Sequence, residues 1–457
     1  MPTSLFGTDG VRGRAGSSPL DERTLVRLGA AVARTCGRQA AQPRVLIGRD
    51  TRESGVWVTR HLARGVEAEA AQVADGGVLS TPAVAFLARD GGFDAGLVVS
   101  ASHNPFQDNG VKVFTGEGMK ADDDLEACLT AIVADYSYTW ADVPLATTKR
   151  VSLATTKRVS LDDSYVEHTR RILDGVVVPA DLRIAIDCAN GATSRIAPTV
   201  LRGLGFDPIV ICDEPDGRNI NLGCGSTHPG RLAQEVLDQG CQMGAAFDGD
   251  GDRVVFVDHS GQLVNGDAVL LIAARRLAAI GTLREKAIVA TVMSNIGLEH
   301  ALSADGITVH WCGVGDRLVW AEMSRRRIVL GGEQSGHIIL SDHLPTGDGL
   351  ATALLIIRAI IETGCDLADL AAGLRPVPQV LVNVRVRRCV PLAELPEVSR
   401  LIEAAEHTLA DTGRILVRYS GTESLLRIMI EGPDRAEIGG LAKTIADRVR
   451  AEVGVGT

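Results

Sequence analysis

Short aliphatic runs alternate with amphipathic helical segments along most of this 457-residue chain. In residues 25–32 the apolar side chains recur at helical spacing, and the apolar run 45–47 then leads into a polar turn. Comparable strand-like runs begin at Ile184 and Ala287. Such alternation is typical of α/β units, in which helices cover a largely parallel or mixed sheet. The sequence therefore predicts an α/β protein built from several such units.

The pattern changes near residue 376. Val382, Val384 and Val386 alternate with polar residues, as in a sheet with one face in water. The elements expected next are a helix at 397–410, strands at 414–418 and 426–431, and a helix after Arg435. Because one core rarely supports a chain this long, three or four domains are expected. We place three α/β domains at 1–160, 161–265 and 266–375, and an α+β domain at 376–457.

One eight-residue segment, 145–152, is followed at once by an identical copy, 153–160. The segment is polar and lies between the first two predicted α/β domains. Because added length in a surface loop costs little entropy, we interpret residues 145–160 as a duplicated linker.

Three carboxylates stand at alternate positions in Asp248-Gly249-Asp250-Gly251-Asp252-Arg253. Apolar runs precede and follow them, so we expect the acids at a turn between two buried strands. Gly249 and Gly251 can adopt positive φ without steric cost, which would let the carboxylates converge. Oxygen-only ligands favour Mg²⁺ or Ca²⁺ over zinc.

Three kinds of site are compatible with acids at alternate positions in a loop. An EF-hand fails, because Arg253 occupies the glycine position and His259 the position of the bidentate glutamate. A solvated acidic turn is disfavoured, because a surface hairpin rarely concentrates three acids between strands this apolar. A catalytic Mg²⁺ site with an open position remains, and Arg253 suggests that the missing ligand is a phosphate oxygen.

A candidate nucleophile follows another apolar run. Residues 95–99 lead into Ser100-Ala101-Ser102-His103-Asn104-Pro105, and the chain returns through 111–114, which contains Lys112. Ser102 thus has a histidine beside it and a lysine ten residues on. An ordinary Ser/Asn/Pro turn explains these residues equally well. The hydrolase elbow G-x-S-x-G is not present here, so Ser-His-Asp acyl chemistry has no support.

Charge and cysteine usage limit the partners. A net charge of −10 and a pI of about 5.5 argue against nucleic acid or an anionic membrane as partner, so local arginines must hold any anionic substrate. The nine cysteines are scattered without paired spacing, which indicates a reduced, cytoplasmic protein. The first residues lack the pattern of a signal peptide, and arginines interrupt the apolar stretches before they reach membrane-spanning length.

Five separated motifs resemble those of the α-D-phosphohexomutases, in the family's order and over the whole chain. They are Phe6-Gly7-Thr8-Asp9-Gly10-Val11-Arg12-Gly13, Ser102-His103-Asn104-Pro105, Asp248 to Arg253, Gly332-Glu333-Gln334-Ser335-Gly336-His337, and Arg418-Tyr419-Ser420-Gly421-Thr422-Glu423. The resemblance implies a four-domain architecture. Residues 333–335, together with 219–221 and 224–228, favour the branch that acts on glucosamine phosphates.

The resemblance implies that Ser102 carries a phosphoryl group, and that one Mg²⁺ per chain bridges this group and Asp248, Asp250 and Asp252. The phosphoserine would donate to the sugar phosphate, a bisphosphorylated sugar would form and turn around, and Ser102 would take back the other phosphoryl group. No ATP is needed. Such transfer depends on charge neutralisation and in-line placement, which a cation and Arg253 would support.

The same resemblance assigns the substrate contacts. A second anion site would comprise Arg418, Ser420, Gly421 and Thr422, assisted by Arg427. Its glycine would let backbone amides face the phosphate, although Ser424 stands where the family usually has proline.

Glu333 and Ser335, with His337 nearby, would bind the sugar hydroxyls. Arg12, His103 and Lys112 are the candidates for general acid and base, and the sequence does not rank them. The implied partner is a hexosamine phosphate, and the family implies a homodimer.

Three other functions are compatible with the same residues. A phosphomannomutase or phosphoglucomutase would use the same mechanism on a different sugar. A Mg²⁺-dependent phosphatase would release free phosphate from Ser102. A sugar-phosphate sensor would have no need for a nucleophile.

Overall fold

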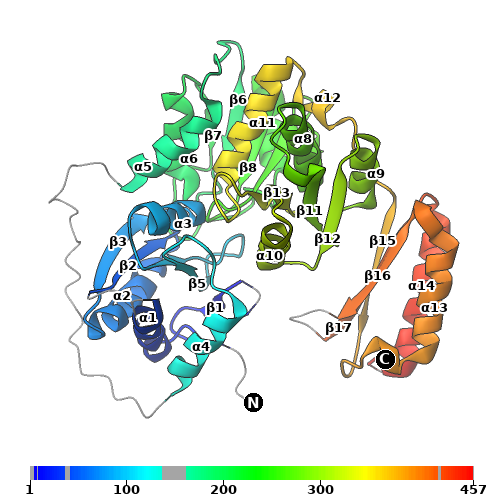
Figure 1. The fold of residues 1–457 in the computed structure, drawn as a ribbon, viewed down its shortest axis with the longest axis horizontal. Coiled ribbons are helices and arrows are strands. Elements are labelled where there is room, and N and C mark those ends of the chain that lie inside the picture. Colours follow the sequence, from blue (N-terminus) through cyan, green and yellow to red (C-terminus); the bar gives the residue numbers. More distant parts are fainter. Residues whose placement is uncertain (1–4, 8, 37–41, 136–160, 420–423, 456–457) are drawn as a thin grey trace. The chain divides into compact units, whose positions relative to one another are not determined.

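The computed structural model describes residues 5–7, 9–36, 42–135, 161–419 and 424–455. The chain forms two compact units, one of residues 1–291 with 309–372 and the other of residues 292–308 with 373–457. The predicted α/β class with a C-terminal α+β part is confirmed (Figure 1). The duplicated segment 145–160 lies outside the described residues. Among the described helices, none combines the length and apolarity that a membrane crossing requires.

The first sheet has the strand order β1-β5-β4-β2-β3. Strand β2 pairs in parallel with β3 and β4, whereas β5 runs antiparallel to β4 and β1. The strands are β1 (Val11–Arg14), β2 (Arg44–Arg49), β3 (Gln72–Val78), β4 (Ala95–Val99) and β5 (Asp108–Thr115). The helices are α1 (Glu22–Cys36), α2 (Gly55–Ala68), α3 (Thr81–Asp90) and α4 (Asp123–Ala134).

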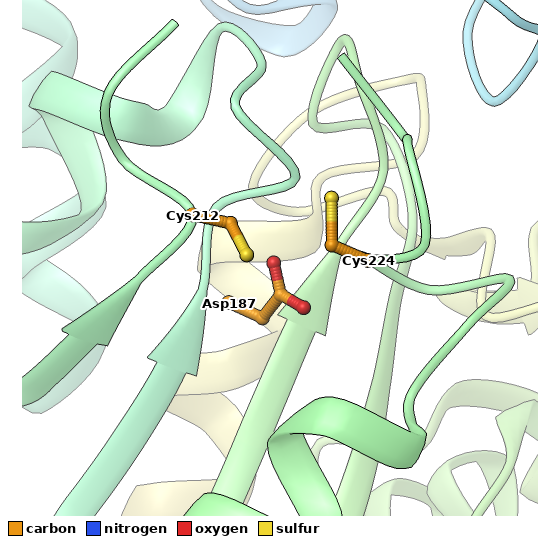
Figure 2. Close-up of side chains that lie close together, drawn as sticks. All are labelled: Asp187, Cys212 and Cys224. Carbon is orange, nitrogen blue, oxygen red and sulfur yellow. The ribbon is translucent and has the colours of Figure 1, made fainter. Parts of the chain in front are cut away.

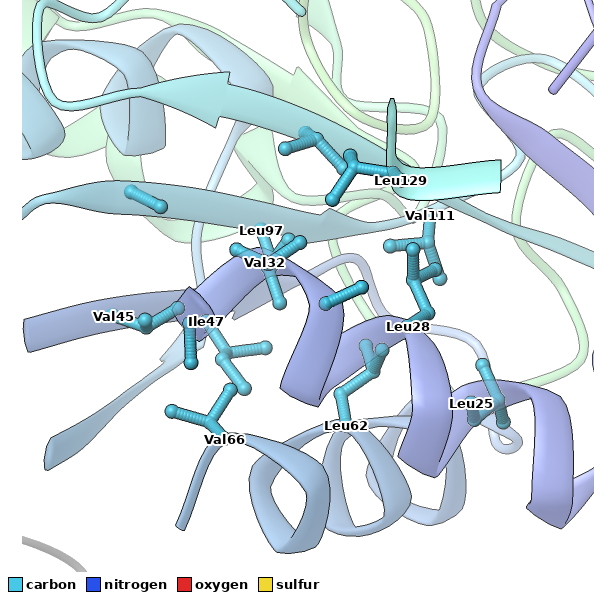
Figure 3. Close-up of a cluster of buried hydrophobic side chains, with 14 of the residues drawn as sticks. Leu25, Leu28, Val32, Val45, Ile47, Leu62, Val66, Leu97, Val111 and Leu129 are labelled. Atoms are coloured by element: carbon cyan, nitrogen blue, oxygen red, sulfur yellow. The ribbon is translucent and has the colours of Figure 1, made fainter. Parts of the chain in front are cut away.

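Alternate residues of these strands serve opposite faces of the sheet. Val45, Ile47 and Leu97 belong to a buried cluster shared with α1 and α2 (Figure 3). Gly48 faces α3 instead, where a Cβ atom would lie 2.4 Å from Cγ2 of Val84. Each fully buried valine, leucine or isoleucine contributes roughly 1.5–3 kcal/mol.

Helices α1 and α2 approach so closely that two crossing positions admit only glycine. A Cβ atom on Gly29 would lie 2.1 Å from the carbonyl oxygen of Leu62, and one on Gly65 would lie 1.9 Å from that of Val26. The two helices therefore pack tightly against each other on one face of the sheet.

The second sheet has the order β10-β9-β8-β6-β7. Its strands are β6 (Ile184–Asp187), β7 (Ile209–Ile211), β8 (Met243–Phe247), β9 (Val254–Asp258) and β10 (Leu263–Val264). Helices α5 (Leu161–Arg170), α6 (Thr193–Gly203) and α7 (Gly230–Gln239) accompany it. Strands β8 and β9 form an antiparallel hairpin, buried throughout, whose connection is the acidic loop. The predicted turn between two buried strands is therefore confirmed.

The third sheet has the order β12-β11-β13-β14. Its strands are β11 (Ala287–Thr291), β12 (Thr308–Cys312), β13 (Leu330–Gly332) and β14 (Ile338–Leu340). The helices are α8 (Gly266–Ala279), α10 (Asp316–Arg326), α11 (Gly349–Thr363) and α12 (Leu367–Ala371). Residues 333–337 connect β13 to β14, so the predicted sugar-binding motif forms a tight turn between paired strands.

The second unit contains an antiparallel sheet of order β15-β17-β16. Its strands are β15 (Gln379–Arg385), β16 (Arg414–Tyr419) and β17 (Leu425–Glu431), and its helices are α9 (Ile296–Ala304), α13 (Pro396–Leu409) and α14 (Arg435–Val453). Val384 and Ile428 pack into a core with Ile438 and Ile445 of α14, whereas Asn383 is exposed. This agrees with the predicted sheet that has one wet face.

Candidate functional site

Ser102 lies in a strained turn just after β4. Its φ is +52°, a region that non-glycine residues rarely adopt, and its side chain is buried. The Ser102 amide donates to Oγ of Ser100 at 2.9 Å, and that hydroxyl donates to Oδ2 of Asp50 at 2.6 Å. Bonds to the turn's surroundings therefore stabilise the strained conformation.

A fully buried arginine, Arg52, organises the same turn. Its Nη2 donates to the carbonyl oxygens of Ser102 at 2.9 Å and Asn104 at 2.8 Å, and its Nη1 donates to that of Asp108 at 3.0 Å. Its Nε donates to Oδ2 of Asp50 at 2.8 Å. Neither Asp50 nor Arg52 was among the predicted site residues, because their only signal was a polar turn after the run 45–47.

The three aspartates of the acidic loop come together at the β8–β9 hairpin. Their ligand oxygens lie within 4.8 Å of one another, and all three side chains are buried. Gly251 has φ +74° as expected, but Gly249 does not adopt positive φ, so that expectation was wrong. Gly249 is required for a different reason: a Cβ atom there would lie 2.6 Å from the carbonyl oxygen of Ser102.

The donor set fits a hard divalent cation. Within the described part of the chain, Oδ1 of Asp250 and Oδ1 of Asp252 are buried without a hydrogen-bond partner. The hydroxyl of Ser102 donates to Oδ2 of Asp248 at 2.6 Å, so the candidate nucleophile adjoins the same cluster. Burial, with the like charges of Asp252 and Asp250, raises the pKa of Asp248 well above its usual range. A divalent cation would offset this repulsion.

Lys112 reaches the acidic loop from β5. Its Nζ donates to Oδ2 of Asp250 at 2.9 Å and Oδ2 of Asp252 at 2.8 Å, and lies 3.4 Å from Oδ2 of Asp9. Burial opposes the charged form, but the three carboxylates raise the pKa of Lys112 well above its usual range. The charged form of Lys112 is therefore favoured by these carboxylates.

Arg12 joins the site through β1. Its Nη1 donates to the carbonyl oxygen of Ser100 at 3.3 Å, and its guanidinium pairs with Asp9. Asp9 also pairs with Lys120, whose Nζ lies 2.6 Å from Oδ2 of Asp316. Burial would raise the pKa of Asp9, but Lys112, Lys120 and Arg12 hold it well below its usual range. Sequence reasoning missed Lys120 and Asp316, which belong to no recognised motif.

His103 borders the Ser102 hydroxyl, and Arg253 contacts His103. Nδ1 of His103 lies 3.3 Å from Oγ of Ser102 and 3.4 Å from Nη1 of Arg253. Burial and the Arg253 charge lower the pKa of His103. Of the three acid–base candidates, His103 is thus the one for which the structure records a hydrogen bond to the serine hydroxyl.

The predicted sugar loop lies against the acidic hairpin, since the Val254 amide donates to the carbonyl oxygen of Gly336 at 3.1 Å. Oε1 of Glu333 accepts from the Gly315 amide at 3.0 Å, and Ser335 is exposed.

His337 has both ring nitrogens engaged within the protein. Its Nε2 accepts from the Gly347 amide at 3.1 Å, and its Nδ1 lies 3.7 Å from Oδ1 of Asp252. The contacts of His337 are therefore those of a residue that positions Asp252.

In the second unit, Arg418 and Arg427 stand directly opposite each other on β16 and β17, and Asn383 of β15 faces Arg427. Burial, followed by the Arg427 charge, lowers the pKa of Arg418. Like charges placed opposite each other in a sheet repel, so an anion is favoured there. The predicted partners Ser420, Gly421 and Thr422 lie outside the described residues.

Family models of phosphoglucomutase/phosphomannomutase match nearly the whole chain. The alpha/beta/alpha domains I, II and III match residues 3–139, 163–261 and 265–377, and the C-terminal domain matches residues 381–448. The phosphoglucosamine mutase of Solibacter usitatus is 46% identical and covers 99% of this chain and 100% of that protein. That of Koribacter versatilis is 45% identical, covering 99% and 97%.

Solved structures share the fold at lower identity. A phosphoglucomutase/phosphomannomutase family protein from Burkholderia thailandensis superposes with a TM-score of 0.80 at 23% identity, covering 99% of both chains. The Aspergillus fumigatus N-acetylphosphoglucosamine mutase, solved with GlcNAc-6P and magnesium, gives a TM-score of 0.66 at 18% identity, covering 98% and 95%. The four matched domains and the full-length relatives show that this chain belongs to the phosphoglucomutase/phosphomannomutase family.

Proposed function

We propose that this chain interconverts glucosamine 6-phosphate and glucosamine 1-phosphate by phosphoryl transfer through Ser102. The observation that carries the proposal is the 2.6 Å contact between Oγ of Ser102 and Asp248, beside Oδ1 atoms of Asp250 and Asp252 that accept no hydrogen bond. The sugar is assigned from the phosphoglucosamine mutases that are 41–46% identical over nearly the full chain. The enzyme is accordingly an intramolecular phosphotransferase that supplies amino-sugar and cell-wall precursors.

The reaction starts from a phosphoryl group on Ser102. The free hydroxyl of the sugar phosphate attacks phosphorus, its proton passes to a base, and the bond from Oγ of Ser102 to phosphorus breaks. The bisphosphorylated sugar then turns around. The Ser102 hydroxyl then attacks the other phosphoryl group, the bond from that phosphorus to the sugar oxygen breaks, and the serine proton passes through the base to the released sugar oxygen. Phosphoserine is restored, so the net transfer consumes no ATP.

Asp248, Asp250 and Asp252 would hold Mg²⁺, which neutralises charge on the transferring phosphoryl group. Arg253, which contacts His103, would add a positive charge for the same phosphoryl group. Among Arg12, His103 and Lys112, the contacts favour His103 for proton transfer. Its ring lies beside Oγ of Ser102 and its lowered pKa favours the neutral form, whereas Lys112 is held charged.

The substrate's other groups need separate contacts. Glu333 and Ser335 are proposed to bind the sugar hydroxyls, with His337 positioning Asp252 behind them. Arg418 and Arg427, with Ser420, Gly421 and Thr422, are proposed to bind the phosphate that does not react. The opposed guanidinium groups on β16 and β17 support this second assignment.

The remaining assignments rest on the family. On that ground we propose four domains with boundaries at 160, 265 and 375, a homodimer, a cytoplasmic location and an activating role for the bisphosphorylated sugar.

The decisive experiment combines peptide mass spectrometry for phosphate on Ser102 with assays on glucosamine, glucose and mannose phosphates. We expect phosphate on Ser102, a preference for glucosamine phosphate, and loss of activity in Ser102→Ala with the fold retained by circular dichroism. Unchanged turnover by Ser102→Ala would overturn the mechanism. A preference for glucose or mannose phosphate would overturn the sugar assignment, and steady release of free phosphate would indicate a phosphatase.

A further inference from the structure

Three side chains that the sequence did not connect meet at one edge of the second sheet. Asp187 ends β6, Cys212 follows β7, and Cys224 lies in the loop before α7. Their carboxylate oxygen and sulfur atoms lie within 4.8 Å of one another. Figure 2 shows the three side chains close together, with the Cys212 sulfur directed toward the Asp187 carboxylate. Asp187 is 0% exposed, Cys212 9% and Cys224 1%.

The backbone fixes the carboxylate of this cluster. Oδ1 of Asp187 accepts from the Ala189 amide at 2.8 Å, and Oδ2 accepts from the Gly225 amide at 2.8 Å. Each carboxylate oxygen has a second lone pair, so these hydrogen bonds orient the Asp187 carboxylate and leave a lone pair on each oxygen for a metal ion.

The donor chemistry differs from that of the acidic loop. Asp248, Asp250 and Asp252 offer oxygen alone, which suits Mg²⁺, whereas two thiols and a carboxylate suit a softer ion. Zinc–sulfur bonds of about 2.3 Å in a tetrahedral zinc site place the two sulfur atoms about 3.8 Å apart. This separation is compatible with ligand atoms that lie within 4.8 Å of one another. We propose that Asp187, Cys212 and Cys224 form a second metal site that binds a thiophilic divalent cation, with Zn²⁺ as the physiological ion.

Binding releases two protons, one from each thiol, and forms two sulfur–metal bonds with no change of oxidation state. The two thiolates and the carboxylate carry three negative charges, so the loaded site has a net charge of −1. The positive charge of Arg231 acts on all three ligands and offsets the remainder. A water molecule completes four-coordination.

A metal ion at this site would also have a structural consequence. The loop that carries Cys224 also carries Asn221, whose Nδ2 donates to the carbonyl oxygens of Ser102 at 2.9 Å and Asn104 at 3.1 Å. A metal ion that joins this loop to β6 and β7 therefore steadies the turn of the candidate nucleophile.

Cobalt(II) is the probe for this site, because thiolate ligands give it an intense charge-transfer absorption. The full-length protein is titrated with Co²⁺ in a phosphine reductant and excess Mg²⁺, which occupies oxygen sites. We expect one equivalent of thiolate-bound Co²⁺, displaced by Zn²⁺, and a rise in Tm when Zn²⁺ is added. Cys212→Ser and Cys224→Ser should each lose the absorption band and the shift in Tm. Cys241→Ala, a buried cysteine of the same domain outside the cluster, should keep both.

Failure is equally clear. Absence of the band in the wild-type protein would overturn the site, whatever the variants do. A band of wild-type intensity in both serine variants would place the metal elsewhere, with the same consequence. Neither the band nor the Tm depends on mutase turnover, so these results stand apart from the test of the proposed reaction.

Discussion

Arg52 hydrogen-bonds the backbone of Ser102 from a fully buried position, with its Nη2 2.9 Å from the serine carbonyl oxygen. The same guanidinium bonds the carbonyl oxygens of Asn104 and Asp108, while Asp50 compensates its charge. A planar fork of five donors can satisfy several carbonyls at once, which an ammonium group cannot. The position of the candidate nucleophile therefore depends on the shape of this side chain as well as on its charge.

Replacing Arg52 by lysine keeps the charge but removes the fork. We expect Arg52→Lys to lower kcat roughly 100-fold, because small displacements of a reacting group cost about this much. Carbonyl groups left without donors should also reduce the free energy of unfolding by about 1–3 kcal/mol. Steady-state kinetics and urea unfolding measure the two effects. Arg49→Lys is the matched control, because it changes a partly exposed arginine at the end of β2 that pairs with Asp75 of β3, and it should behave as wild type. A wild-type kcat in Arg52→Lys would show that the Ser102 turn keeps its conformation without the arginine hydrogen bonds.

Asn221 braces the same turn from the second sheet. Its amide group donates to the carbonyl oxygens of Ser102 and Asn104, so Asn221→Asp removes both bonds while keeping the size of the side chain. We expect kcat to fall roughly 10–100-fold with KM nearly unchanged, because the residue positions the nucleophile and does not touch the substrate. Asn219→Ala, which changes a partly exposed residue of the same loop that makes no bond to the Ser102 turn, should leave kcat intact. An increase in KM alone would assign Asn221 to substrate binding instead.

Local periodicity was sufficient to predict the strands and helices that carry these residues. The run 45–47 became β2, the run 95–99 became β4, and the acidic segment became the β8–β9 hairpin. Each of these depends on side-chain alternation and turn chemistry that lie close together in the sequence. The acidic loop and Ser102 could be predicted for the same reason.

Contacts between distant segments could not be predicted in this way. Arg52 reaches Ser102 because β2 pairs with β4. The residues 48–52 themselves contain no pattern from which this pairing could be predicted. Cys212 and Cys224 were interpreted as scattered cysteines, because the strand order β8-β6-β7 alone brings them beside Asp187. Gly249 was assigned to backbone freedom, whereas the close approach of Ser102 requires it.

Lys112 and a bound cation compete for the same carboxylates. Its Nζ bonds Oδ2 of both Asp250 and Asp252, so Lys112→Met removes a positive charge next to the metal site. We expect Mg²⁺ to bind roughly threefold to tenfold more tightly, because Coulomb repulsion near the site decreases. We also expect kcat to fall, since the transferring phosphoryl group loses a compensating charge.

Activity as a function of Mg²⁺ concentration measures both effects of Lys112→Met. Lys120→Met is the matched control, because Lys120 pairs with Asp9 and Asp316 instead of the metal acids. It should leave the apparent Mg²⁺ affinity near that of the wild type. Weaker Mg²⁺ binding in Lys112→Met would contradict the expectation and indicate that the lysine shapes the carboxylates more than it repels the ion.

A stack of aromatic rings predicts sensitivity to acid. His168 lies between Phe86, 4.5 Å away by ring centroids, and His343, 4.2 Å away. Burial, with the neighbouring His343, lowers the pKa of His168 from 6.5 to about 4, although Asp348 opposes the shift. The unfolded chain therefore binds a proton at His168 that the folded protein excludes between these values. Stability should be complete above pH 6.5 and fall as the pH drops from 6.5 toward 4.

His168→Phe keeps the stacked ring and removes the titration, so its stability should fall less between pH 7 and pH 5 than that of the wild type. The measurement is the change in urea midpoint between pH 7 and pH 5, determined for the wild type and for His168→Phe. Titrating groups that behave alike in the two proteins contribute equally to both changes. His407→Phe, on the exposed face of α13, should keep the wild-type dependence on pH. Equal losses of midpoint in wild type and His168→Phe would show that the ring is protonated as readily in the folded protein as in the unfolded chain.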